Sequence, residues 1–82
     1  AALDFLLAPN PATETLRIAF GEALRSDTRI RVFDTAGRLM QTDNLASGKV
    51  VTQLNIMHLP EGMYTVVVDN AQGSGVRKLM VR

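Results

Sequence analysis

The stretch TRIRVFDTAGRLMQT, residues 28–42, decides the fold of this chain. Polar and apolar residues alternate up to Val32, which is the period of two expected of a strand with one buried face. The cassette Asp34-Thr35-Ala36-Gly37 then interrupts the pattern, and the alternation resumes at Arg38. Glycine reaches positive φ without a steric penalty, and aspartate hydrogen-bonds its own backbone in turns. The stretch therefore predicts a β-hairpin that Asp34 and Gly37 turn.

The same alternation recurs along the rest of the chain, with turn residues between the runs. It predicts further strands over residues 15–20, 50–57, 64–68 and 76–81, and a weaker strand or linker over 3–7. We expect loops over 21–26 and 44–49 and a flexible turn over 69–75, where Asp69 and Asn70 would act as Asp34 does. Parallel strands need long crossover connections, for which 82 residues leave no room. The pattern predicts an antiparallel β-sandwich of about seven strands.

Composition limits the classes of function. The chain has no cysteine, which excludes disulfides, thiolate metal sites and a thiol nucleophile. Its net charge of +1 is scattered over the strands, without the one-sided basic surface that nucleic-acid binding requires. No apolar run approaches the roughly 20 residues that span a bilayer, so we expect no direct membrane insertion. The start at Ala1-Ala2, without Met, indicates a piece of a longer protein.

Catalytic chemistry is not predicted. The only histidine is His58, beside a Leu-Pro turn, where an exposed loop residue is the simplest interpretation. The acidic residues occur singly and show no calcium-loop spacing, which leaves only a weak loop-bound Ca²⁺ open. We therefore expect no catalytic residue, no metal site and no cofactor.

Two proline cassettes and the last strand complete the pattern. In Pro9-Asn10-Pro11-Ala12 the two prolines end an extended segment. In Leu59-Pro60-Glu61-Gly62-Met63-Tyr64, Gly62 turns the chain and Tyr64 begins a strand, and we expect its hydroxyl to bond a backbone group at a corner. The run Arg77-Lys78-Leu79-Met80-Val81-Arg82 is an ordinary final strand with a basic edge, if it is considered alone.

Taken together, the order of these motifs resembles the C-terminal sorting domain of type IX secretion cargo over roughly residues 8–82. The resemblance implies an immunoglobulin-like sandwich, with residues 1–8 as a linker or first strand from the parent protein and 9–82 as the sorting domain. It implies that Pro9, Asn10 and Pro11 lie near the junction with the cargo. It also implies that the last residues are the export address, here Lys78, Leu79, Met80, Val81 and Arg82. Arg77 and Arg82 stand where the family commonly has lysine, and a pocket shaped for an ammonium would not treat them alike.

The resemblance also implies a function and partners. The domain would direct a larger cargo of a Gram-negative bacterium through the periplasm to the outer membrane and the cell surface or extracellular space. The outer-membrane type IX machinery would recognise it, and a sortase-like peptidase would remove it while joining the cargo to an anionic surface lipopolysaccharide. The alternative is a small adhesive or carbohydrate-binding accessory module, for which one tyrosine and three phenylalanines make a poor aromatic platform.

The strand faces support one more hypothesis. Six residues are expected to point inward: Ile30, Val32, Tyr64, Val66, Leu79 and Val81. Phe33, Val67, Val76 and Met80 would then form an outward apolar stripe, fringed by Lys78 and Arg82. This stripe is either a docking surface or an idle or covered patch. An uncovered edge strand could also let copies associate, and the order of strands in the sheets is not predicted.

Overall fold

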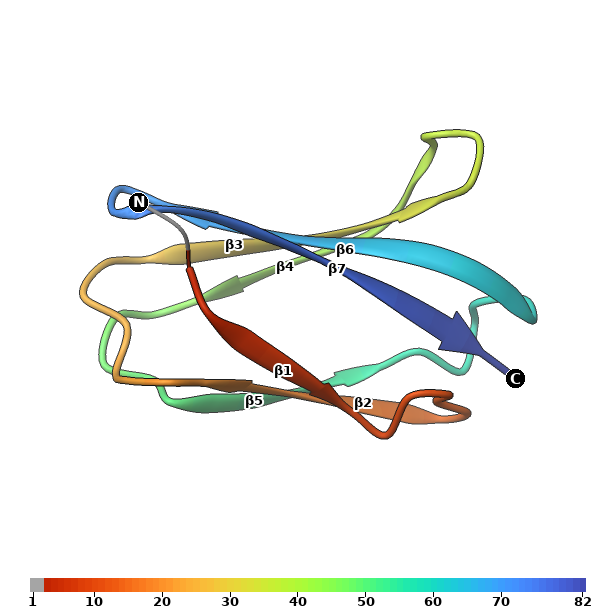
Figure 1. Ribbon diagram of the computed structural model, residues 1–82, viewed down its shortest axis with the longest axis horizontal. Helices are drawn as coiled ribbons and strands as arrows, with labels where there is room; N and C mark the ends of the chain where they lie inside the picture. Colours follow the sequence, from red (N-terminus) through yellow and green to blue (C-terminus); the bar gives the residue numbers. More distant parts are fainter. Residues whose placement is uncertain (1–2) are drawn as a thin grey trace.

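The computed structural model describes residues 3–82, which form two layers of β-strands (Figure 1). None of these residues belongs to a helix that could cross a membrane. Seven strands follow one another along this part of the chain: β1 Phe5–Ala8, β2 Thr15–Phe20, β3 Thr28–Asp34, β4 Leu39–Leu45, β5 Val51–Asn55, β6 Gly62–Asn70 and β7 Gly73–Val81.

The strands pair in two antiparallel sheets. The smaller sheet has the order β1-β2-β5, and the larger has the order β4-β3-β6-β7. Short turns join β3 to β4 and β6 to β7 within the larger sheet, and a loop joins β1 to β2 within the smaller one, while the other three connections cross between the layers. The predicted seven-stranded antiparallel sandwich is confirmed, and residues 5–8 form a paired strand.

The core lies between the layers and follows from the alternation of apolar residues. All six residues expected to point inward from the larger sheet are buried. The smaller sheet contributes Phe5, Leu16 and Ile18, and the rings of Phe5 and Phe20 lie 6.1 Å apart. Because branched aliphatic side chains fill most of the interior, stability depends on the packing of many modest contributions.

The β3–β4 hairpin is turned as predicted. One carboxylate oxygen of Asp34 accepts the backbone N–H of Ala36 at 3.0 Å and that of Arg38 at 2.9 Å. The other oxygen accepts the Nε–H of Arg38 at 3.1 Å. Gly37 has a φ of 85°, the left-handed region that favours glycine. The backbone N–H of Arg38 is the largest of the effects that hold the pKa of Asp34 below its ordinary value.

The predicted corner at Tyr64 is also present. The phenol ring is buried, and its hydroxyl donates a hydrogen bond to the carbonyl oxygen of Pro60 at 2.5 Å. Leu59, just before this corner, is buried as well. The side chain of Tyr64 therefore ties the entry of β6 to the core.

Three expectations about loops are wrong. The segment 69–75 is not a flexible turn, because β6 continues to Asn70 and β7 begins at Gly73. Asp69 does not shape that turn, since it pairs with arginines of β3; the side chain of Asn70 accepts the N–H of Gln72 instead. The predicted loop 44–49 begins too early, because β4 runs through Leu45, which is buried. Cross-strand pairing extended these strands through residues with poor local strand propensity.

Candidate functional site on the last strand

Strand β7 has an inner and an outer face. Leu79 and Val81 point into the core, with exposed fractions of 0% and 1%. Lys78 and Met80 are exposed on the other side, and Arg82, the residue after β7, is exposed as well. Of the five residues predicted as the export address, two therefore hold the fold together, and only three can be touched by another molecule.

The free edge of β7 is covered by the segment that precedes β2. The N–H of Leu3 donates to the carbonyl of Ser74 at 2.9 Å. At the other end, Ala12 bridges to Val81 in a parallel sense, and its N–H donates to Met80 at 2.8 Å. In Figure 1, β1 starts beside β7, and the loop after β1 lies at the end of the domain where β7 finishes. This contact protects an edge that would otherwise be open to strand addition.

Asn10 is the central residue of this cover. Its side-chain Nδ2 donates to the carbonyl of Lys78 at 3.1 Å, and its Oδ1 accepts the N–H of Met80 at 3.0 Å. The amide thus bonds β7 in the way that the backbone of a neighbouring strand would. Sequence reasoning placed Asn10 at a junction and missed this contact. The one available signal was an amide side chain held between two prolines.

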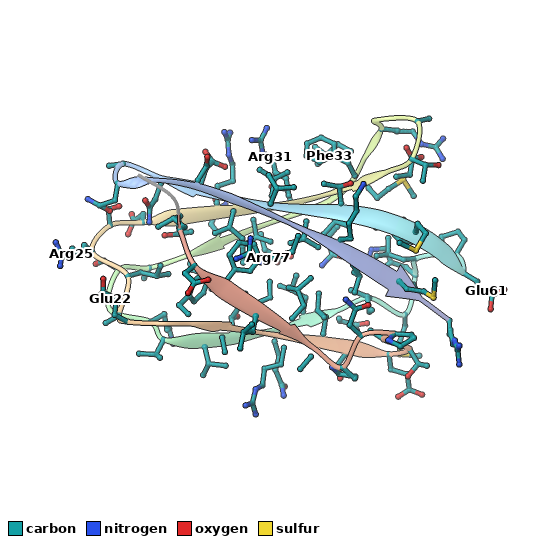
Figure 2. The ribbon with its side chains drawn as sticks, in the orientation of Figure 1. Glu22, Arg25, Arg31, Phe33, Glu61 and Arg77 are labelled. Carbon is teal, nitrogen blue, oxygen red and sulfur yellow. The ribbon has the colours of Figure 1, made fainter. Side chains whose placement is uncertain are left out.

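Arg77 and Gly75 close the gap between the two sheets. The guanidinium of Arg77 lies between β7 and β1, 3.1 Å from the carboxylate of Asp4 and 4.8 Å above the ring of Phe5 (Figure 2). A Cβ on Gly75 would lie 2.4 Å from the carbonyl oxygen of Leu3 and 2.7 Å from the Phe5 ring. Only glycine lets β1 approach this closely, so Gly75 belongs to the packing and not to a turn.

The outer face of the larger sheet carries the predicted apolar stripe, although in a different arrangement. Val67 and Val76 lie opposite each other, and Met80 lies opposite Met63. The next position along β7 is Lys78, opposite Thr65, so the lysine lies inside the stripe and not at its fringe. The stripe is therefore two apolar pairs separated by one ammonium group.

Phe33 lies on the same face in β3, which β6 separates from β7. It is opposite Thr65 and half-buried, with the guanidinium of Arg31 5.5 Å from the centre of its ring (Figure 2). Arg31 and Arg29 both pair with Asp69, at 3.4 and 3.2 Å. Two arginines thus share one carboxylate, which leaves this part of the face positive.

The family comparison agrees with these motifs. The family model described as "Secretion system C-terminal sorting domain" matches residues 7–82. This range includes Asn10, the turn at Asp34 and Gly37, the corner at Tyr64, and β7. The chain belongs to this family. As a type IX sorting domain, it is a signal for export toward the outer membrane and cell surface.

Comparison with solved structures supports the fold of the sorting domain. It resembles a DUF3244 family protein from Bacteroides vulgatus, which has an immunoglobulin-like β-sandwich, with a TM-score of 0.66 and 17% identity over 93% of this chain and 91% of the other. The immunoglobulin-like architecture is therefore confirmed. The CARDB domain of a Pyrococcus furiosus protein, solved with di-metal ions, matches at a TM-score of 0.42 and 14% identity, over 98% and 88% of the two chains. No curated protein matches the chain.

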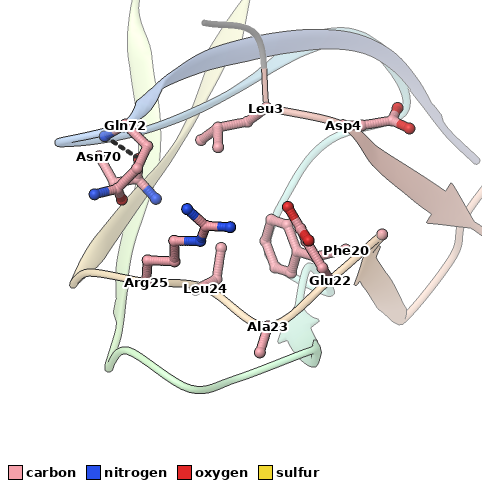
Figure 3. A pocket seen from close by; sticks show the side chains of 10 residues that line it. Leu3, Asp4, Phe20, Glu22, Ala23, Leu24, Arg25, Asn70 and Gln72 are labelled. Carbon is pink, nitrogen blue, oxygen red and sulfur yellow. Dashed lines mark hydrogen bonds between the residues drawn. The ribbon is translucent and has the colours of Figure 1, made fainter.

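A hollow of about 360 Å³ lies at the end of the sorting domain opposite the Asn10 loop. Figure 3 shows Phe20 and Leu24 at its base and Arg25 extending into it, with Glu22 on the same loop.

His58 is exposed and does not line this hollow. Within residues 3–82, no three His, Asp or Glu side chains are grouped closely enough to hold a metal ion. A secretion signal of this fold is typically non-catalytic.

Proposed function

We propose that the type IX secretion machinery reads the outer face of the larger sheet. The residues that carry this recognition are Lys78 and Met80 of β7 and Arg82 directly after it, with Phe33, Val67 and Val76 on the same sheet. Gly37, Gly62 and Tyr64 hold the scaffold that presents these side chains.

One observation supports this proposal most directly. The inner face of β7 is buried, and its edge is bonded by Asn10 and Ala12, so the outward side chains are what this strand offers to a partner. A partner could add no strand at this edge without first displacing the segment before β2.

The later steps of export are part of the same proposal. The cargo crosses the periplasm, and after export a sortase-like peptidase removes the sorting domain and attaches the cargo to the cell surface. We place the cut on the N-terminal side of Leu3, because proteolysis favours segments free of pairing, whereas the N–H of Leu3 bonds Ser74 and β1 is hydrogen-bonded to β2. Mass spectrometry of the released domain tests this placement. A fragment that starts after Ala8 would contradict it.

The alternative function, an adhesive or carbohydrate-binding module, finds little support on this face. Phe33 is half-buried under Arg31, and no other aromatic ring lies in the stripe. A glycan array with the purified domain separates the two functions.

A reporter fusion tests the proposed function. Deletion of the last five residues would also remove Leu79 and Val81 from the core, so loss of export in that variant could reflect unfolding. We therefore compare two triple variants of a periplasmic reporter that carries the domain. The test variant is Lys78→Ser/Met80→Ser/Arg82→Ser, and the control is Arg17→Ser/Leu6→Ser/Lys49→Ser, which also removes two basic and one apolar exposed side chain.

We expect the test variant to remain folded by circular dichroism and to lose export, while the control is exported like the wild type. Equal export of all three reporters would contradict the proposed recognition surface.

A further inference from the structure

The outer face of the larger sheet carries a hollow. A cavity of about 360 Å³ lies between the β3–β4 turn, β6 and β7. Its walls include Phe33, Met63, Thr65 and Lys78. We call this cavity the Lys78 hollow. It is large enough to receive a side chain and not only a water molecule.

The charges around the Lys78 hollow are unequal. Asp34 lines it, but both carboxylate oxygens of Asp34 already accept hydrogen bonds from the turn and from Arg38. Within residues 3–82, Lys78 has no ion-pair partner. The hollow therefore presents one unmatched ammonium group.

The walls beside that ammonium group are apolar. Phe33 and Met63 both line the hollow, and Met63, 41% exposed, lies opposite Met80, 39% exposed, on the neighbouring strand. Unbranched methionine side chains adapt to the shape of a partner, which suits a site that must accept a loop. The positive arginine pair on Asp69 lies on the same sheet face and adds long-range attraction for negative charge.

We propose that the Lys78 hollow binds an acidic segment of a protein, in which one carboxylate side chain meets Lys78 and a neighbouring apolar side chain fills the cavity. This inference rests on the proposed function and names the chemistry of its partner. An anionic lipid surface is less suitable, because it attracts clusters of basic side chains, whereas the hollow itself is lined by one basic residue, Lys78, together with Phe33 and Met63. Complementary charge would also speed and orient the encounter with the machinery.

An export assay tests whether Lys78 meets a carboxylate of the partner. The variant Lys78→Glu places like charges together and should abolish export of the reporter fusion. The control Lys49→Glu makes the same charge change at an exposed position of the β4–β5 loop and should leave export unchanged. The neutral variant Phe33→Ser removes one apolar wall and should reduce export without a change of charge.

A binding experiment tests the same site without the secretion system. The probe is the peptide acetyl-Leu-Asp-Leu-amide, titrated into the isotope-labelled domain, with acetyl-Leu-Asn-Leu-amide as the matched neutral peptide. We expect amide resonances of Phe33, Met63 and Lys78 to shift, and the acidic peptide to bind about two- to fivefold more tightly, as for an exposed ion pair. Vesicles of phosphatidylglycerol, added to the same labelled domain, test whether an anionic lipid surface binds instead.

The outcomes separate the two proposals. Lack of export of the wild-type reporter would overturn the proposed function. Normal export of Lys78→Glu beside an exported wild type would overturn the Lys78 hollow and leave the proposed function intact. Equal shifts with both peptides, no shift with either, or binding to vesicles alone would also overturn the acidic protein partner.

Discussion

The inner and outer faces of the larger sheet differ in the exposure of their side chains, although the same alternation of residues along the strands produces both. On the inner face, Ile30, Val66 and Leu79 have no exposed surface. On the outer face, Val76 is 53% exposed and Lys78 has no ion-pair partner within the described residues. One strand therefore both stabilises the domain and carries the side chains that we propose as its export address. Deletion of the whole strand would therefore affect stability and recognition together, whereas single substitutions on one face affect them separately.

The largest expected effect is on the inner face. Tyr64→Ala should destabilise the domain by roughly 3–5 kcal/mol, because it empties a buried site and removes the bond to Pro60. That is a large share of the stability of a small domain. Tyr64→Phe keeps the ring and should cost only about 1 kcal/mol. Urea unfolding measures the destabilisation of both variants. Similar midpoints for Tyr64→Ala and wild type would contradict the claim that the inner face stabilises the domain.

A smaller effect is expected where β1 meets β7. Gly75→Ala forces a methyl group against the Leu3 carbonyl and the Phe5 ring, and should destabilise the domain by roughly 1–3 kcal/mol. Gly21→Ala is the matched control, because nothing lies within 4 Å of its added Cβ; we expect a change within about 0.5 kcal/mol. Equal thermal melts of the two variants would argue against close packing at Gly75.

The edge contact of Asn10 should have an effect of about 1 kcal/mol on unfolding, since its two hydrogen bonds are exposed. Its local effect is sharper. In Asn10→Ala the amide of Met80 loses its acceptor, so hydrogen exchange at Met80 should accelerate while exchange at Val66 changes little. Unchanged exchange at Met80 would show that the amide of Asn10 does not hold β7.

The smallest effect concerns pH and the β3–β4 turn. The folded domain lowers the pKa of Asp34, so its carboxylate contributes stability above the unfolded pKa of about 4, and this contribution is lost as the pH falls through the folded pKa. The stability difference between wild type and Asp34→Asn should therefore shrink below about pH 4. Chemical unfolding at several pH values measures it, and a constant difference would contradict the assigned cause.

Much of the fold could be predicted from local patterns. Alternation defined the inward residues, and Asp34 and Gly37 turned their hairpin as expected, because both effects act within a few residues. The 69–75 segment was misassigned because its glycines suggest a turn, whereas Gly75 is required by Phe5, about seventy positions earlier in the chain. Such a requirement leaves no local signal.

The site was predictable only in part. The last strand stays the predicted export address, but the alternation that buries Leu79 and Val81 was not applied to it. The role of Asn10 depends on which loop covers the edge of β7, and therefore on the order of the strands. Strand order is a property of the whole chain, and similar short strands allow several arrangements.

The most direct test of the central claim is the export of a reporter that carries Phe33→Ser/Val67→Ser, measured beside a control with Leu6→Ser/Val51→Ser on the outer face of the smaller sheet. We expect both variants to melt cooperatively and only the Phe33/Val67 variant to lose export. Wild-type export of a folded Phe33→Ser/Val67→Ser reporter would contradict the claim that the outer face of the larger sheet is read by the secretion machinery.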